Sequence, residues 1–394
     1  MWVPLDPLYV AYAAVSGLAG PGAEEEVEKL LEGEENPTTR LIDGLYALAC
    51  TAREAPAVAA LVADPPPDAL DRLAALPEAA ASLARLEELL STFGDRSGAG
   101  YGSDVTICAP TWRDDPTLVL RFATPYLDPT VEPPAAARAR AQAERDVLIE
   151  ALCRACDDPE AIADFRRELA YGRRQAAVME QHNHYIDQMM IGQLRRAILA
   201  AARWLVARGA LATTEEVFWL HYDEILSALR ASTQPSFAEV ISARQAQHAT
   251  WEKLDPPSLL GTPEARLPGR PPLADEVTEM VHQDEGMISG LGASPGRHRG
   301  RARVVPTTVL LPNLLPGEVL VAENVGPRWT PLIPILGGLV LDGGALGQHH
   351  AITAREYGVP AVIGTRNGTR RIPDGAWVTV DGAAGTVEVE TLPE

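Results

Sequence analysis

The chain has few cysteines and a deficit of basic side chains, and each shortage excludes a class of protein. Four cysteines in 394 residues are too few for a disulfide framework. Reduced thiols in a cytoplasmic protein are the simpler account. Cys153 and Cys156 form a CxxC pair within a helical pattern, but no second pair lies nearby, so we expect no metal site. Lys and Arg number 34 against 54 Asp and Glu, a formal net charge of -20. We therefore expect neither nucleic acid nor an anionic membrane to bind through general electrostatic attraction.

Long hydrophobic runs are also missing. No apolar run approaches the roughly 20 residues of a membrane span. The first six residues, MWVPLD, lack a basic region and a continuous apolar core, so we expect no secretory signal. With 46% hydrophobic and 22% charged residues, the composition is typical of a soluble globular protein. The length suffices for two or three domains.

The first two thirds of the chain have helical periodicity. Amphipathic patterns occupy residues 24–31, 39–52 and 70–90, separated by prolines. Pro133 and Pro134 mark the start of a helix over residues 135–156, and a second helical pattern runs from 159 to about 209. Six prolines between residues 255 and 272 indicate a connecting segment, which a helix-like stretch over 275–282 follows.

From residue 290 the pattern changes to short apolar runs separated by Pro-Gly and Asp-Gly turns. Strands are predicted over residues 302–305, 318–321, 339–341, 361–363, 377–380 and 386–389. A helix is predicted from Gln348 to Tyr357, with Gly358 and Pro360 as its stop. The predicted fold class is therefore multidomain α + α/β, with a large, mostly helical domain over residues 1–285 and a small α/β domain over 286–394.

Residues 337–364, GGLVLDGGALGQHHAITAREYGVPAVIG, combine a buried strand, a glycine loop and a helix that starts at two histidines. The first N–H groups of a helix are unpaired, and the macrodipole places about half a positive charge there. We expect His349 to stay neutral in this field and to keep a nucleophilic lone pair, and a phosphoryl group on it would lie where anions are favoured. The alternative, on spacing alone, is that two polar residues occupy an exposed helix start.

This segment resembles the phosphohistidine, or mobile, domain of the phosphoenolpyruvate (PEP)-utilising enzymes, which include PEP synthase, pyruvate phosphate dikinase and rifampin phosphotransferase. The family motif is Thr-Asp-x-Gly-Gly-x-x-Ser/Thr/Cys-His-Ala-x-Ile-x-Ala-Arg-Glu followed by Gly-Ile-Pro-Ala-Val, and it aligns with residues 341–362. The resemblance implies a small swivelling domain in which His349 carries a phosphoryl group. It also implies that Asp342, Gly344 and Arg355 belong to the phosphate loop.

The match departs from the family around that histidine. Leu341 and Ala345 replace the motif's Thr and second Gly, Gln348 replaces the hydroxyl or thiol residue, and His350 replaces a small residue. These changes alter the polar surroundings of His349. An acid–base role for His349 and His350, with Gln348 as a hydrogen-bond donor, therefore stays open beside phosphoryl transfer.

A second candidate site lies in the long helical pattern, where residues 180–188 read EQHNHYIDQ. Helical spacing places His184 beside Asp187 and Gln188, with His182 on the preceding turn. A neutral histidine held by a carboxylate can act as a base or orient a substrate hydroxyl. The alternative is a hydrogen-bonded structural pair. In the family that the chain resembles, this stretch lies in the acceptor-binding region.

The resemblance extends to two further loops. Gly94-Asp95-Arg96-Ser97 is similar to a Gly-His-Arg-Gly loop of the family, with Asp95 in place of the histidine. Residues 327–331, PRWTP, are similar to its aromatic-Thr-Pro loop. The resemblance therefore implies substrate contacts at Arg96 and Trp329.

A complete enzyme of this family also carries an ATP-grasp domain, or a barrel that binds PEP, to charge the histidine. Neither fits in this chain, whose layout is closest to rifampin phosphotransferase without its ATP-grasp domain. The first hypothesis is a cytoplasmic phosphotransferase component that carries a phosphoryl group on His349 to a small-molecule hydroxyl. A separate ATP-grasp subunit would charge it and would bind ATP and Mg²⁺, while this chain alone binds no cofactor.

Two other hypotheses stay open. In one, the scaffold serves a non-phosphorylating enzyme of specialised metabolism, such as a dehydratase, an isomerase or a cyclase. In the other, the chain is a catalytically silent binding protein.

Overall fold

A computed structural model describes residues 6–18, 26–27, 29–31, 35–96, 107–232, 235–251, 253–254, 287–306, 313–326 and 329–390. They form two compact units. The first draws on Met1–Val105, Ala109–Met190 and Gln283–Glu394, and the second on Thr106–Cys108 and Ile191–His282. The proposed connecting segment, the helix-like stretch over 275–282 and the glycines after Arg96 lie outside the described residues.

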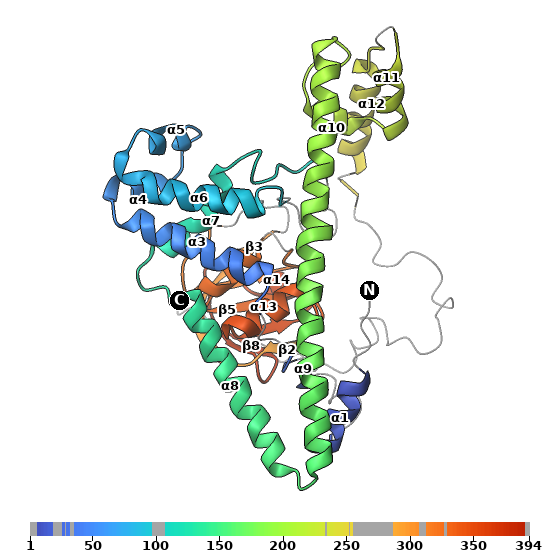
Figure 1. The fold of residues 1–394 in the computed structure, drawn as a ribbon. Helices are drawn as coiled ribbons and strands as arrows, with labels where there is room; N and C mark the ends of the chain where they lie inside the picture. Colours follow the sequence, from blue (N-terminus) through green and yellow to red (C-terminus); the bar gives the residue numbers. More distant parts are fainter. Residues whose placement is uncertain are drawn as a thin grey trace, which may run out of the picture. The chain divides into compact units, whose positions relative to one another are not determined.

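The N-terminal part of the first unit is helical, as the periodicity predicted (Figure 1). Its helices are α1 (Asp6–Ser16), α3 (Pro37–Arg53), α4 (Pro56–Ala63), α5 (Ala69–Ala74), η1 (Pro77–Ala79), α6 (Ala80–Phe93), α7 (Thr117–Ala123), η2 (Thr124–Leu127), α8 (Pro134–Ala155), α9 (Pro159–His182) and the π-helix η3 (Asn183–Met189). The predicted span 70–90 is divided at Pro77, because proline has no N–H to continue a helix.

Helix α3 lies at the centre of these helices. Leu41, Leu45, Leu48 and Ala52 recur with helical spacing, and each is fully buried in the main hydrophobic core. Asn36 caps the start of α3 by accepting a hydrogen bond from the backbone N–H of Thr39 at 3.0 Å. This capped, buried turn fixes the position of the residues that begin α3.

The C-terminal part of the first unit is an eight-stranded mixed sheet, so the predicted α/β domain is confirmed. Its elements are β1 (Met287–Ser289), β2 (Leu291–Ser294), β3 (Arg297–Val305), β4 (Val319–Ala322), η6 (Thr330–Ile335), β5 (Gly338–Leu341), α13 (His349–Tyr357), β6 (Ala361–Ile363), α14 (Gly368–Arg371), β7 (Trp377–Asp381) and β8 (Thr386–Val389). All six predicted strands are present, while β1 and β2 were not predicted.

The strand order is β1-β8-β7-β3-β4-β5-β6-β2, with parallel pairing from β3 to β6. Val321, Val340 and Val362 lie side by side in this register, and all three are fully buried. Such near-continuous apolar strands are expected where both faces of a parallel sheet are covered. Because β1 and β2 are separated by Gly290 alone, the two ends of the sheet come from one short stretch of chain.

Helix α13 packs against the helical part of the first unit, beside α8 (Figure 1). Three side chains of that part donate hydrogen bonds to the C-terminal half of α13. Asn36 Nδ2 donates to Glu356 Oε1 at 3.0 Å, Arg145 Nη1 to the Arg355 carbonyl at 3.0 Å, and Arg138 Nη1 to the Tyr357 hydroxyl at 3.0 Å. The structure therefore holds the sheet domain docked through α13.

The second unit is built from α10 (Met190–Ala207), η4 (Glu215–Trp219), α11 (Tyr222–Arg230) and α12 (Ala238–Trp251). Its core is a separate apolar cluster that includes Leu205, Val217 and Ile241. Arg244 forms a two-pronged ion pair with Glu224, at 2.7 and 2.9 Å, and so ties α12 to α11. No helix among the described residues meets the length and hydropathy that a membrane crossing requires.

Candidate active site at the start of helix α13

Helix α13 begins at His349, directly after the glycine loop. Gln348 precedes it with extended backbone, and its exposed side chain makes no capping bond. Gly344 has a φ of 122°, which a residue with a side chain rarely adopts. The helix ends at Gly358 in the left-handed conformation, as predicted. The sequence thus places two histidines in the first turn, where helix N–H groups are unpaired.

Two charged side chains brace the ends of the glycine loop. At its start, the Asp342 carboxylate accepts hydrogen bonds from the Thr365 hydroxyl at 2.9 Å and from the backbone N–H of Thr369 at 3.2 Å. At its end, Arg355 donates to the Leu346 carbonyl at 3.0 Å and to the Ala293 carbonyl at 2.9 Å. Asp342 and Arg355 therefore bind the loop to the rest of the sheet domain.

His349 contacts a carboxylate from the helical part of the unit. Its Nδ1 lies 2.6 Å from Oε1 of Glu180 on α9, and both side chains are more than nine-tenths buried. Glu180 was not singled out from the sequence as a site residue, although it begins the polar stretch 180–188. Its other oxygen, Oε2, accepts a hydrogen bond from the Thr38 hydroxyl at 3.1 Å.

This contact determines which nitrogen of His349 is chemically available. A carboxylate can only accept hydrogen bonds, so the hydrogen of the neutral ring resides on Nδ1. Nε2 then carries the lone pair. It is buried and makes no hydrogen bond within the described structure. In this arrangement Nε2 can act as a nucleophile or as a base.

His350 has a different environment from its neighbour. Its side chain is 3% exposed, and burial, reinforced by His349 and Arg355, lowers its pKa to about 4. A hydrogen bond with the backbone of Val325 acts in the opposite direction. A Cβ atom on Gly344 would lie only 3.0 Å from its Nε2. His350 is therefore a neutral side chain packed beneath the glycine loop.

From Asn183 onwards the polar stretch 180–188 adopts a π-helix, and this corrects the predicted pairing. Asp187 was expected beside His184, but its carboxylate lies 3.4 Å from Nδ1 of His182. Likewise, Gln188 donates to Asn183 at 3.1 Å. Each of these pairs is five residues apart, because a π-helix brings residues i and i+5 together, whereas an α-helix brings i and i+3 or i+4 together. His182 and Asp187 are both partly exposed.

His184, about one turn after Glu180, is buried. Burial, followed by the positive charges of Arg96 and Arg40, lowers its pKa to about 4. Its ring packs edge-on against Phe93, with 5.3 Å between ring centroids. The structure thus brings His184 and Arg96 together, as neutral and charged members of one buried cluster.

The remaining predicted contact residue, Trp329, belongs to the core. It is 2% exposed and packs within the main apolar cluster, next to residues 327–328, which lie outside the described residues.

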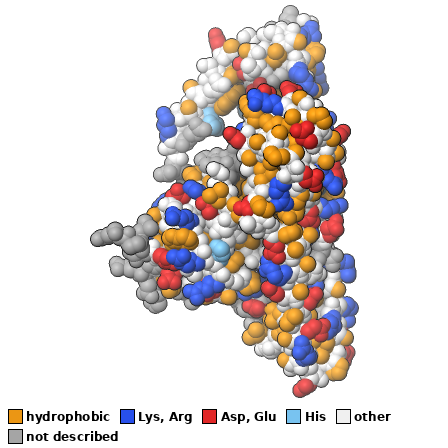
Figure 2. All heavy atoms as spheres, turned by 90° about the vertical axis from the view of Figure 1, so that its left-hand side faces the viewer, with side chains coloured by type: hydrophobic (Ala, Val, Ile, Leu, Met, Phe, Trp, Pro, Cys, Tyr) orange, Lys and Arg blue, Asp and Glu red, His pale blue; other side chains and the backbone are white. Residues whose placement is uncertain are grey.

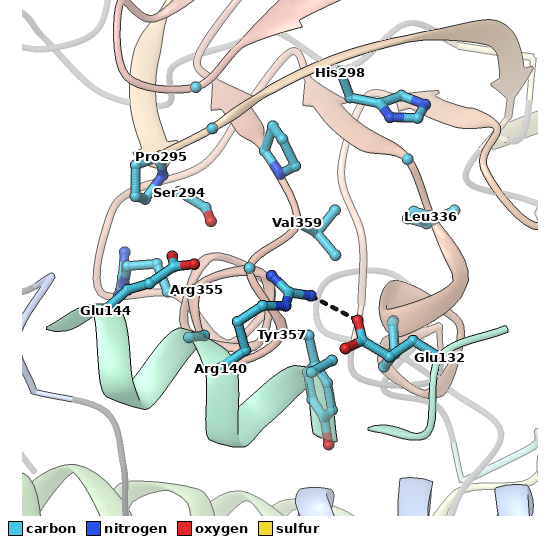
Figure 3. A pocket seen from close by; sticks show the side chains of 18 of the residues that line it. Glu132, Arg140, Glu144, Ser294, Pro295, His298, Leu336, Arg355, Tyr357 and Val359 are labelled. Atoms are coloured by element: carbon cyan, nitrogen blue, oxygen red, sulfur yellow. Dashed lines mark hydrogen bonds and ion pairs between the residues drawn. The ribbon is translucent and has the colours of Figure 1, made fainter. Parts of the chain in front are cut away.

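A cavity of about 950 Å³ lies at the opposite end of α13 from His349. It is bounded by α8, by the turn after β2 and by the turn after α13, and Ser294, Arg140 and Glu144 surround it (Figure 3). His349 and Glu180 do not line it. The candidate active site at His349 is therefore separate from this cavity.

Within the described ranges, no group of three or more His, Cys, Asp or Glu side chains is arranged to hold a metal ion. Figure 2 shows that acidic and basic side chains are interspersed over one face of the molecule.

Family models match both the helical part and the sheet part of the first unit. Residues 314–385 match the family model of the PEP-utilising enzyme mobile domain. Residues 6–179 match that of the rifampicin phosphotransferase fourth domain.

Several characterised proteins are similar along most of the chain. A rifampicin phosphotransferase of a Streptomyces species is 31% identical over 91% of this chain and 40% of its own length. The prodigiosin synthesizing transferase of Serratia marcescens is 27% identical over 88% of this chain and 38% of its own length. Chondramide synthase of Chondromyces crocatus is 32% identical over 91% of this chain, which corresponds to 9% of its own length. The chain thus spans well under half of each of these relatives.

The two matched segments account for the docked helices and for the domain that carries His349. The chain therefore carries a rifampicin phosphotransferase fourth domain over residues 6–179 and a PEP-utilising enzyme mobile domain over residues 314–385.

Proposed function

We propose that the chain is a phosphotransferase component in which His349 Nε2 receives a phosphoryl group and passes it to a hydroxyl of a small molecule. The observation that carries this proposal is the 2.6 Å contact between His349 Nδ1 and Glu180, because it leaves the lone pair on Nε2. An ATP-grasp partner would bind ATP and Mg²⁺ and would supply the phosphoryl group.

The transfer has two halves. In the first, the Nε2 lone pair forms a bond to phosphorus while the bond from phosphorus to the donor's oxygen breaks. In the second, the acceptor's hydroxyl oxygen forms a bond to phosphorus, the N–P bond breaks with its electron pair returning to Nε2, and the hydroxyl proton leaves to a base. In the docked state, where the second half takes place, Glu180 accepts the Nδ1 hydrogen bond and stabilises the positive charge of the phosphorylated ring until the N–P bond breaks.

Nε2 is buried in the docked arrangement, so charging requires α13 to leave the helices. The docked state is the one in which a carboxylate of the helical part, Glu180, meets His349. We assign it to the acceptor side of the cycle, with the acceptor near the polar stretch that contains His182, His184 and Asp187. The proposed domains are the helical part up to residue 285 and the mobile domain from 286.

A second candidate is an enzyme of specialised metabolism that transfers protons only, namely a dehydratase, an isomerase or a cyclase. The Glu180–His349 pair favours it, because a histidine oriented by a buried carboxylate is also a general base. The names of two relatives, chondramide synthase and the prodigiosin synthesizing transferase, also describe the making of specialised metabolites.

Intact-mass measurement on protein isolated at mildly alkaline pH separates the two candidates. We expect one acid-labile phosphoryl group that maps to His349 and is absent from His349→Ala. His248→Ala, which removes a histidine on α12, is the matched control and should keep the group. A phosphoryl group that persists in His349→Ala would exclude His349 as its carrier. Complete absence from the wild type, even after incubation with ATP-grasp candidates, would favour the proton-transfer enzyme.

A further inference from the structure

The first turn of α3 contacts both the carboxylate and the helix that make up the site. Thr38, the second residue of α3, donates its hydroxyl hydrogen to Glu180 Oε2 at 3.1 Å. Asn36, the cap of the same turn, donates to Glu356 on α13 at 3.0 Å. Asn36, Thr38 and Glu180 are 2%, 2% and 5% exposed. The first turn of α3 therefore forms hydrogen bonds with both α9, which carries Glu180, and α13, which carries His349.

We propose that Thr38 is a positioning residue, whose hydroxyl holds Glu180 in the orientation that keeps the His349 hydrogen on Nδ1 and leaves Nε2 as the reacting atom. This inference rests on the proposed role of His349 and goes beyond it, because it assigns control of the reacting nitrogen to a residue that acts on His349 through Glu180.

The geometry of the carboxylate supports this role. The terminal torsion of glutamate is broad, so an unrestrained carboxylate turns easily about its last bond. Here Oε2 is held by Thr38 at 3.1 Å, and this directs Oε1 to Nδ1 at 2.6 Å. Without the hydroxyl, the carboxylate is free to turn away from Nδ1 within its buried site.

The N-terminal turn of α3 also favours the negative charge of Glu180, which supports the same tautomer of His349. Glu180 meets the N-terminal turn of α3, a 17-residue helix, where the macrodipole favours negative charge. An ionised Glu180 can only accept a hydrogen bond. It therefore selects the His349 tautomer with hydrogen on Nδ1, since the partner of one ring nitrogen decides where the hydrogen of a neutral histidine resides.

The test reads the tautomer directly and needs no substrate. The full chain, unphosphorylated and labelled with ¹⁵N-histidine, is examined by long-range ¹H–¹⁵N correlation at pH 8, with His349→Gln identifying the resonances of His349. We expect hydrogen on Nδ1 in the wild type. In Thr38→Val, which preserves side-chain shape, we expect the ratio of Nδ1–H to Nε2–H forms to fall by about tenfold, the effect of losing a hydrogen bond to a charged group.

Three further variants make the result specific. Thr38→Ser restores the hydroxyl and should restore the wild-type spectrum. Thr39→Val is the matched control, because it removes a neighbouring hydroxyl that bonds only to the backbone of Asn36. It should destabilise the start of α3 while His349 keeps its tautomer. In Glu180→Gln, the Thr38 hydroxyl donates to the amide oxygen, so the amide NH₂ group faces Nδ1 and should move the hydrogen to Nε2.

An unchanged tautomer in folded Thr38→Val would overturn the positioning role. If that variant does not fold, an unchanged tautomer in Glu180→Gln overturns the proposal instead. These outcomes are independent of the proposed function, since His349 can carry phosphate without help from Thr38. Conversely, a Thr38-dependent tautomer in a chain that is never phosphorylated would support the inference and point to the proton-transfer enzyme.

Discussion

Acidification from pH 7 to pH 4 is expected to destabilise the protein through His350. The side chain is 3% exposed, and its pKa in the folded protein is about 4, against 6.5 in an unfolded chain. Because the folded-state pKa is the lower one, the unfolded chain binds the proton first as the pH falls. Stability from this group is therefore complete above about pH 6.5 and is lost as the pH falls from 6.5 to 4.

The size of the loss follows from the two pKa values. One pKa unit corresponds to about 1.4 kcal/mol, so the unfolded state gains about 3 kcal/mol on the folded state at pH 4. Against a typical free energy of unfolding of roughly 5 to 15 kcal/mol, such a loss is readily detected.

Urea unfolding, followed by tryptophan fluorescence at pH 7 and pH 4, measures this loss in the wild type and in His350→Ala. The variant has a cavity that lowers its stability at both pH values, but it has no imidazole to titrate at this position. His184, whose pKa is also about 4, is present in both proteins and cancels in the comparison. We expect the wild type to lose about 3 kcal/mol more than the variant between the two pH values. Equal losses would refute the claim that His350 is neutral because it is buried.

Two further predictions concern the loop and the docked helix. Gly344→Ala should destabilise the protein by about 1–3 kcal/mol, because the φ of Gly344 is 122° and the new Cβ would lie too close to His350. The control is Gly343→Ala, whose Cβ would meet only a carbonyl at 3.4 Å and which should lower the melting temperature far less. Equal losses of melting temperature in the two variants would argue against a strained loop. Asn36→Asp retains a capping oxygen for α3 but replaces the amide that donates to Glu356 with a negative charge. Amide hydrogen exchange in α13 should therefore accelerate by about fivefold or more, while α3 stays protected. Unchanged exchange in α13 would show that the Asn36–Glu356 bond does not hold the docked state.

The sheet domain was largely predictable from sequence because its signals are local. Buried strands such as β6 are bounded by glycine or proline, and Gly358 marks the end of α13. Strands β1 and β2 escaped prediction, since three or four residues on either side of Gly290 do not differ from a linker. Only their pairing with β8 and β6, distant in sequence, makes them strands.

The sequence predicted His349 in the candidate site but not its partner Glu180. The position of His349 at a helix start follows from residues within one turn of it, and so could be inferred. Its partner could not, because Glu180 lies 169 residues earlier and its role depends on how α9 meets α13. The polar stretch 180–188 indicated that something unusual occurs there, but a spacing rule for α-helices gave the wrong pair for Asp187. The π-helix that re-pairs it has no simple signature in the sequence.

The way in which the sheet ends also bears on aggregation. An exposed strand edge presents unpaired N–H and C=O groups that can template pairing with another chain. Here the two outermost strands have three and four residues and are consecutive in the chain, so each offers only a few such groups. A side chain at Gly290, between them, would meet the Ile363 carbonyl at 2.4 Å, so this tight junction requires glycine. If the sheet domain undocks as proposed, it uncovers side chains but few unpaired backbone groups, so we expect it to separate from its partner helices without seeding fibrils.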